Sequence, residues 1–186
     1  MKILWMLVIA IVAAASCAAQ STISTLALKK TDGTLAQFRP SDAPATVVVF
    51  ISALCPMSVE YSERLSKLAI EFEGKGVRFL LVNSNLNESD ADVEKQRSAA
   101  SIPIPIYRDP GGQVAEMLGA SATPTAVVLD RTAITRYFGM IDNSRNPARV
   151  TKQPLRAALQ SVLAGTPVEI ARTRVLGCTI KNAASP

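Results

Sequence analysis

The stretch that decides the fold runs from Thr46 to Ser58 and reads TVVVFISALCPMS. Its first half is a continuous run of β-branched and aromatic residues, which is typical of a strand buried on both faces of a sheet. The run ends just before Cys55-Pro56, and proline suits the first turn of a helix. The stretch therefore predicts a buried strand that turns into a helix, with Cys55 at the junction.

The residues after Cys55 continue this alternation. Between Pro56 and Gly74 the apolar residues form one helical stripe, which consists of Tyr61, Leu65, Leu68 and Phe72. The segment 77–82 predicts a second buried strand, and 89–100 predicts a second helix with Ser89 as its N-cap. A third strand is expected over 102–107. Because Pro103 and Pro105 lack N–H groups on the same side, we expect that strand at a sheet edge.

The remaining segments complete an α/β pattern. We expect a hairpin of 24–28 with 35–38 around Asp32-Gly33, a short helix after the turn at 109–112, strands at 126–129 and 133–138, and a last helix over 153–164. The first crossover strands should be parallel and the last pair antiparallel. The pattern predicts a central mixed β-sheet flanked by helices.

The composition excludes several classes of function. The chain has 186 residues, of which 48% are hydrophobic, enough for one sizeable core. Its net charge of +5 is spread along the chain, so we expect no nucleic-acid partner. There is no histidine, which excludes Ser-His-Asp and Cys-His pairs and most zinc or iron sites. We expect neither a metal nor a cofactor.

The N-terminus has the pattern of an export signal. Lys2 is followed by an apolar run over 3–15 and then by small residues around Cys17. Cleavage after Ala19 would remove residues 1–19; cleavage after residue 16 would leave a lipid anchor on Cys17. A retained membrane span is disfavoured, because a span needs about 20 apolar residues. We expect a domain over 20–167 and a tail over 168–186, in the periplasm or cell envelope, with membrane contact only through the signal or the lipid.

Cys55 is the candidate reactive residue of the chain. A cysteine at a helix N-terminus lies near unpaired N–H groups and the positive end of the helix dipole, which favour the thiolate. The alternative is a buried free cysteine that acts as a small hydrophobic residue. The loop position and the neighbouring Pro56 favour the reactive interpretation.

Two motifs make the chain resemble the thioredoxin superfamily. They are Cys55-Pro56-Met57-Ser58 at a strand-to-helix turn and Ala122-Thr123-Pro124-Thr125 before a strand. The segment 105–112 and the tail 176–181 are similar to the redoxin branch, which includes alkyl hydroperoxide reductase and thiol-specific antioxidant (peroxiredoxin-like) proteins and membrane-linked thiol-disulfide oxidoreductases. The resemblance covers residues 23–181. It implies an exported protein with a thioredoxin-like fold, a redoxin-type insertion and a cis Pro124 beside the active-site turn.

The chain departs from these families at several positions. Ser58 stands where a dithiol motif has its second cysteine, so a mixed disulfide on Cys55 cannot be resolved within the motif. Ser52 matches a Thr/Ser position of peroxiredoxins, but Val48 stands at their proline position. The Thr123-Pro124 turn stands where they carry an arginine. Arg108 and Arg131 are candidate substitutes, or else solvated turn residues.

Cys178 has more than one interpretation. It could resolve an oxidised Cys55, since an extended, flexible tail would let it approach. It could instead form a permanent structural bridge or an intermolecular bridge, or remain unpaired.

Two classes of function follow. The first is a thiol-disulfide oxidoreductase or peroxiredoxin-like antioxidant peroxidase. Cys55 would be the nucleophile, and Ser52 and Ser58 would hydrogen-bond to its thiolate. Thr123-Pro124 would shape the substrate groove and block metal access. Cys178 would resolve the oxidised Cys55. The partners would be a thiol reductant or a protein disulfide, with peroxide as a candidate substrate. The second class is a non-catalytic binding or scaffold module.

Overall fold

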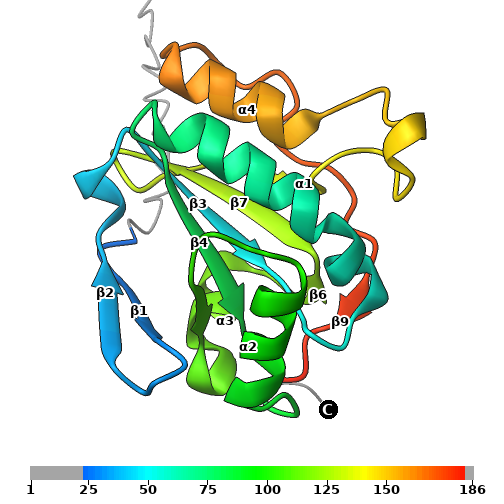
Figure 1. Cartoon of the computed structure of the whole chain (residues 1–186). Helices are drawn as coiled ribbons and strands as arrows, with labels where there is room; N and C mark the ends of the chain where they lie inside the picture. Colours follow the sequence, from blue (N-terminus) through cyan, green and yellow to red (C-terminus); the bar gives the residue numbers. More distant parts are fainter. Residues whose placement is uncertain (1–22, 183–186) are drawn as a thin grey trace, which may run out of the picture.

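The structure is a computed structural model that describes residues 23–182, so the expected export signal lies outside the described residues. Its centre is a seven-stranded sheet in the order β2-β1-β5-β4-β3-β7-β8 (Figure 1). The strands are β1 (Leu26–Lys29), β2 (Leu35–Phe38), β3 (Ala45–Phe50), β4 (Arg78–Asn83), β5 (Ile106–Arg108), β7 (Thr125–Asp130) and β8 (Thr135–Gly139). The short strands β6 (Ala122–Thr123) and β9 (Cys178–Thr179) form a separate pair.

The predicted strand directions are confirmed. β3 pairs in parallel with β4, and β4 in parallel with β5, whereas β7 runs antiparallel to both β3 and β8. β1 and β2 form the expected antiparallel hairpin. Its turn contains Gly33 with φ +84°, a left-handed conformation that glycine adopts without a steric penalty. The chain therefore has the mixed α/β sheet that its pattern of strands and helices indicated.

The prediction that the third crossover strand lies at a sheet edge is wrong. β5 lies between β1 and β4. The strand begins only at Ile106, so Pro103 and Pro105 precede it and their missing N–H groups cost no ladder hydrogen bond. On its β1 side the pairing is limited to Lys29 opposite Arg108.

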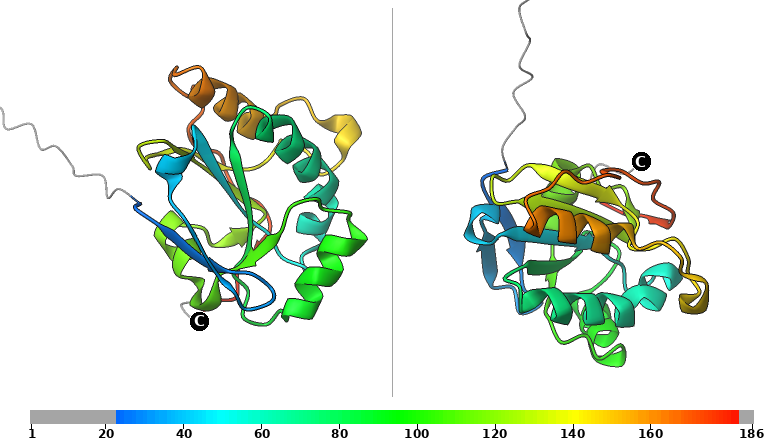
Figure 2. Two further views of the ribbon diagram at one scale, coloured as in Figure 1. Left: turned by 60° about the vertical axis from the view of Figure 1, so that its left-hand side comes forward. Right: turned by 90° about the horizontal axis from the view of Figure 1, so that it is seen from above.

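Helices cover both faces of the sheet. They are α1 (Pro56–Glu73), α2 (Asp90–Ala99), α3 (Gln113–Leu118) and α4 (Pro154–Leu163), with single 3-10 turns at Pro40–Asp42, Pro110–Gly112 and Pro147–Arg149. Val47 and Val49 of β3 belong to the core cluster under α1 and α4, whereas Val48 and Phe50 belong to the cluster on the α3 side. This alternation is the two-residue period of a strand buried on both faces. Figure 2 shows the same layers from two further directions.

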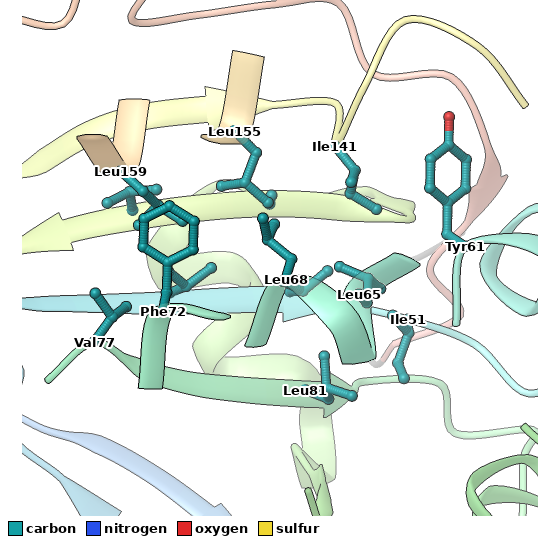
Figure 3. Packing of buried hydrophobic residues seen from close by; sticks show 14 of the residues in the cluster. Ile51, Tyr61, Leu65, Leu68, Phe72, Val77, Leu81, Ile141, Leu155 and Leu159 are labelled. Atoms are coloured by element: carbon teal, nitrogen blue, oxygen red, sulfur yellow. The ribbon is translucent and has the colours of Figure 1, made fainter. Parts of the chain in front are cut away.

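The predicted helical stripe forms the centre of the first cluster. Leu65, Leu68 and Phe72 of α1 point between the sheet and the α4 residues Leu155 and Leu159 (Figure 3). The predicted N-cap of α2 is also present: the Ser89 hydroxyl accepts from the Asp92 N–H, and the Asp92 carboxylate accepts in return from the Ser89 backbone, a full capping box. No helix of the described residues is long and apolar enough to cross a membrane.

The C-terminal segment is anchored to the domain rather than loose, which corrects the expectation of a flexible tail. Phe138 of the edge strand β8 accepts from the Thr173 N–H and donates to the Ala171 carbonyl, at 3.0 and 2.9 Å. Further on, the Ile180 N–H donates to the Ser121 carbonyl at 2.9 Å, and the Ile180 side chain is buried in the α3-side cluster. The segment therefore runs from the β8 edge to the end of the molecule that carries β6.

Substitution of Phe72 by alanine tests the core. Phe72 is fully buried between α1 and α4, so Phe72→Ala should lower the free energy of unfolding by about 3–5 kcal/mol. Urea unfolding followed by circular dichroism measures this loss. Ile70→Ala on the same helix is the matched control, because Ile70 is exposed; it should change stability by less than about 0.5 kcal/mol. Equal losses in the two variants would contradict the packing described here.

Candidate functional site

Cys55 is the N-cap residue of α1, as the sequence predicts. Its backbone is extended (φ −88°, ψ 114°), and its carbonyl accepts the first helical hydrogen bond from the Val59 N–H at 3.1 Å. Pro56 follows in the first turn, which contains no acidic residue. The positive end of an 18-residue helix therefore faces Cys55 without an opposing carboxylate in that turn.

A buried carboxylate holds the turn that leads into Cys55. Glu88 accepts hydrogen bonds from the Ser52 hydroxyl at 2.5 Å, from the Ala53 N–H at 2.6 Å and from the Asn83 amide at 2.7 Å. The amide of Gln96 donates to the Ser52 carbonyl at 3.2 Å. The Ser52 hydroxyl is thus directed at Glu88 and not at the Cys55 sulfur, so its contribution is to fix the turn.

The second predicted motif lies against Cys55. The Thr123–Pro124 peptide bond is cis, as the resemblance implies. The Cys55 thiol donates to the Thr123 carbonyl, with Sγ 3.4 Å from the oxygen. Two segments that are 68 residues apart therefore meet at this carbonyl.

Cys178 lies at the same place because β9 pairs with β6. Cys178 is the register partner of Thr123, and the Thr123 hydroxyl donates to the Cys178 carbonyl at 3.4 Å. Figure 1 shows β6 and β9 side by side at the end of the sheet. Thr123 is therefore in contact with Cys55 through its carbonyl and with Cys178 through its strand pairing.

The pairing of β9 requires a glycine before Cys178. A Cβ atom placed on Gly177 would lie 1.9 Å from the Thr123 carbonyl oxygen and 2.7 Å from its carbon. Any larger residue would overlap with backbone that cannot move aside without opening the strand pair. The close approach of the tail to Thr123 is consequently tied to this one position.

The two cysteines differ in exposure and acidity. Cys55 has 1% of its surface exposed, whereas Cys178 is exposed. Burial alone would raise the pKa of Cys55, but hydrogen bonds from the Cys178 side chain and from the backbones of Ser58 and Cys178 bring that pKa below its ordinary value. The hydrogen bond to Cys55, followed by loss of hydration of the thiol, raises the pKa of Cys178 to about 11. The pair thus favours a thiolate on Cys55 and a thiol on Cys178.

The other predicted site residues take different places. Ser58 contributes its backbone to Cys55, while its buried hydroxyl has no hydrogen-bond partner among the described residues. Arg108 is engaged elsewhere: it donates to the Asn83 side chain and to the Asn85 and Glu88 carbonyls, and it pairs with Asp90. Arg131 follows β7 at the end opposite to Thr125, so it lies away from the site.

Sequence reasoning missed Glu88 and Gln96. Neither belongs to a motif, and a loop glutamate is usually solvated. Their role depends on the pairing of β3 with β4, which brings the end of one strand next to the loop after the other. In the described part of the chain, no three Cys, Asp or Glu side chains gather to hold a metal ion.

Comparisons with known proteins agree with this geometry. Residues 19–138 match the model of the AhpC/TSA family. A search of curated proteins gave no match.

Several solved structures are similar. A hypothetical protein from Sinorhizobium meliloti has 32% identity and a TM-score of 0.78, with 88% of this chain and 94% of that chain covered. An uncharacterized conserved protein from Geobacillus kaustophilus has 31% identity and a TM-score of 0.78, with coverage of 89% and 92%. A putative thiol:disulfide interchange protein DsbE from Chlorobium tepidum shares the fold at 18% identity and a TM-score of 0.63, with coverage of 76% and 95%.

Gly177→Ala tests the contact between the tail and Thr123. The added methyl group cannot fit beside the Thr123 carbonyl, so β9 should separate from β6 at a cost of about 1–3 kcal/mol in stability. Cys55 should then be alkylated by iodoacetamide several-fold faster. Gly74→Ala is the control, because no atom lies within 4 Å of its Cβ position and its φ of −61° is ordinary. An unchanged alkylation rate in Gly177→Ala would contradict the role of this contact.

Thiolate absorbance tests the coupling between the two sulfurs. Because the Cys178 hydrogen bond lowers the pKa of Cys55, Cys178→Ser should weaken that bond and raise the pKa of Cys55. Conversely, Cys55→Ser removes the neighbouring thiolate, so the pKa of Cys178 should fall from about 11 toward its ordinary value. Ultraviolet titration of both variants gives the two values. If each cysteine titrates in the same way with and without the other, the coupling is absent.

Proposed function

We propose that this chain, which belongs to the AhpC/TSA family, is a thiol-disulfide redox protein in which Cys55 and Cys178 form a reversible disulfide. One observation carries the proposal: Cys55 donates to the carbonyl of Thr123, and Cys178 is the strand partner of that same residue. Dithiol motifs carry a second cysteine at the position that Ser58 occupies here. Cys178 would act as that second redox cysteine.

The unequal environments assign different parts to the two sulfurs. In the oxidised protein, the thiolate of a reductant would reach the exposed Cys178 and attack its sulfur, and Cys55 would leave as a thiolate. A leaving thiolate departs more readily when its pKa is low, which is the condition of Cys55. A second reductant thiol then attacks the mixed disulfide on Cys178. The products are the protein dithiol and one reductant disulfide, so two electrons and two protons are transferred.

In the other direction, the reduced protein would be oxidised by a partner disulfide, which is reduced to two thiols. Once Cys55 is exposed by movement of the tail, its thiolate can attack a partner disulfide and release one partner thiolate. Cys178 then attacks the mixed disulfide on Cys55, which closes the intramolecular bond and releases the second partner thiolate. No cofactor enters either direction.

The two arginines that the sequence offers as peroxidatic substitutes, Arg108 and Arg131, give no support to peroxide reduction. A peroxidatic cysteine is aided by a nearby cation as the O–O bond breaks. Arg108 is already held by Asn83, Asn85 and Glu88, and Arg131 lies at the far end of β7. Neither candidate substitute is placed to serve Cys55.

We also propose that the protein works outside the cytoplasm. The support is the signal pattern over residues 1–19, with residues 20–167 as the working domain and 168–186 as the tail that delivers Cys178. Such a compartment lets a disulfide persist until a specific partner reduces it. Its partner would be a thiol reductant or a protein with a disulfide.

The test uses protein with Cys17→Ser, so that Cys55 and Cys178 are the remaining thiols. Treatment with glutathione disulfide should give an intramolecular disulfide, seen as the loss of two hydrogens in intact mass, and dithiothreitol should reverse it. Cys178→Ser and Cys55→Ser should each give a glutathione adduct instead, because neither can close the bond. Turnover of an insulin disulfide should exceed that of hydrogen peroxide.

Three results would count against the proposal. Adducts on both cysteines with no internal bond would refute the pairing. Peroxide turnover that exceeds disulfide turnover would favour the peroxidase. Equal, near-zero turnover in the protein and in Cys55→Ser would favour a scaffold.

A further inference from the structure

A groove lies beside the site, lined by residues that are near both cysteines in the chain. Its volume is about 540 Å³, and its walls include Met57 from the first turn of α1, the cis proline Pro124, and Leu176 from the tail that carries Cys178. Met57 and Pro124 lie next to the two motifs that meet at Cys55, and Leu176 is exposed. A molecule in this groove would therefore touch the apolar surroundings of the redox pair.

The groove carries positive charge that the protein itself leaves unpaired. Arg145, Arg149 and Arg174 line it. Among residues 23–182, Arg149 and Arg174 form no ion pair or side-chain hydrogen bond, whereas most of the other arginines have such a partner. Arg145 pairs with Glu60 through two hydrogen bonds, so the unpaired charge of the groove belongs to Arg149 and Arg174.

The one acidic side chain in the groove is already neutralised. Asp142 accepts from Arg64 and from the Tyr61 hydroxyl, and it is buried. It therefore does not offset the charges of Arg149 and Arg174. Arg145 is also close enough to interact electrostatically with both Cys55 and Cys178, so the charge lies within reach of the reaction.

A second groove near Cys55 has mainly acidic side chains among its charged lining residues. It has a volume of about 740 Å³, and it is lined by Leu54, which precedes Cys55. Its charged lining consists of Glu60, Glu63, Asp92 and the single cation Lys95. Glu60 pairs with Arg145 and Glu63 with Lys67, both from outside this groove. Arginines without a partner are therefore a feature of the groove at Met57 and not of this second groove.

We propose that the arginine-lined groove binds an acidic peptide segment that flanks the disulfide of a protein partner. This inference rests on the proposed function, because it names the substrate class of the same site. The apolar floor suits a peptide side chain, and Arg149 and Arg174 offer guanidinium donors to its carboxylates. In the reaction, the protein dithiol reduces the bound disulfide to two thiols and itself becomes the Cys55–Cys178 disulfide.

Charge-matched peptide disulfides test the inference. Three peptides share one disulfide and differ only in flanking residues, which are acidic, neutral or basic. Bis(2-hydroxyethyl) disulfide serves as a small uncharged substrate. The rate of oxidation of the reduced protein should be at least about tenfold higher for the acidic than for the basic peptide at low salt. The preference should fade near 1 M salt, where the screening length is about 3 Å.

Two single variants localise the effect. Arg174→Gln should reduce the acidic-to-basic rate ratio by about threefold or more at low salt. Arg131→Gln is the matched control, because it removes the same charge at a place outside the groove. Arg131, like Arg174, has no ion pair or side-chain hydrogen bond in the described part. The control should leave the ratio unchanged.

The alternatives give distinct results. A negative thiolate alone would attract the basic peptide, so a basic peptide that reacts as fast as the acidic one overturns the inference. An equal effect of Arg131→Gln and Arg174→Gln would assign the preference to net charge and also overturn it. If bis(2-hydroxyethyl) disulfide oxidises the protein but none of the peptides does, the groove assignment fails and the proposed function stands. If nothing, including that small disulfide, oxidises Cys55, the proposed function itself fails.

Discussion

The site depends on one crowded contact, the approach of the tail backbone at Gly177 to the carbonyl of Thr123. That contact seats β9 on β6 and so brings Cys178 to the residue against which Cys55 already lies. Without it, Cys55 would stand as a solitary thiol at a helix start. The requirement is steric, since only a residue without a side chain can pass so close to a carbonyl oxygen.

The same arrangement sets the balance between the thiol and the thiolate of Cys55. Removal from water disfavours the Cys55 thiolate, whereas the hydrogen bonds from Cys178 and from the backbone of Ser58 favour it, and the second influence prevails. Glu88 contributes indirectly, because its carboxylate fixes Ser52 and Ala53 and thereby the direction in which the chain enters α1. A buried acid whose oxygens accept from three donors stiffens the turn.

Much of the fold could be predicted from local pattern. The buried run of β3, the stripe of α1 and the Ser89 cap each carry their signal within a few residues, and all three are present. The edge prediction failed because Pro103 and Pro105 precede the strand instead of belonging to it, and element boundaries are poorly encoded locally. Glu88 and the anchored tail depend on contacts between distant segments, which periodicity does not report. The two cysteines and the Thr123-Pro124 turn could be singled out, but the pairing of Thr123 with Cys178 could not be derived without coordinates.

The match to the family model ends at residue 138, whereas Cys178 lies in the C-terminal segment after it. Cys178 is thus supplied by a part of the chain that the family model does not match, although that part also adds Leu155, Leu159 and Ile180 to the core. Relatives that share the core but end differently need not share its chemistry.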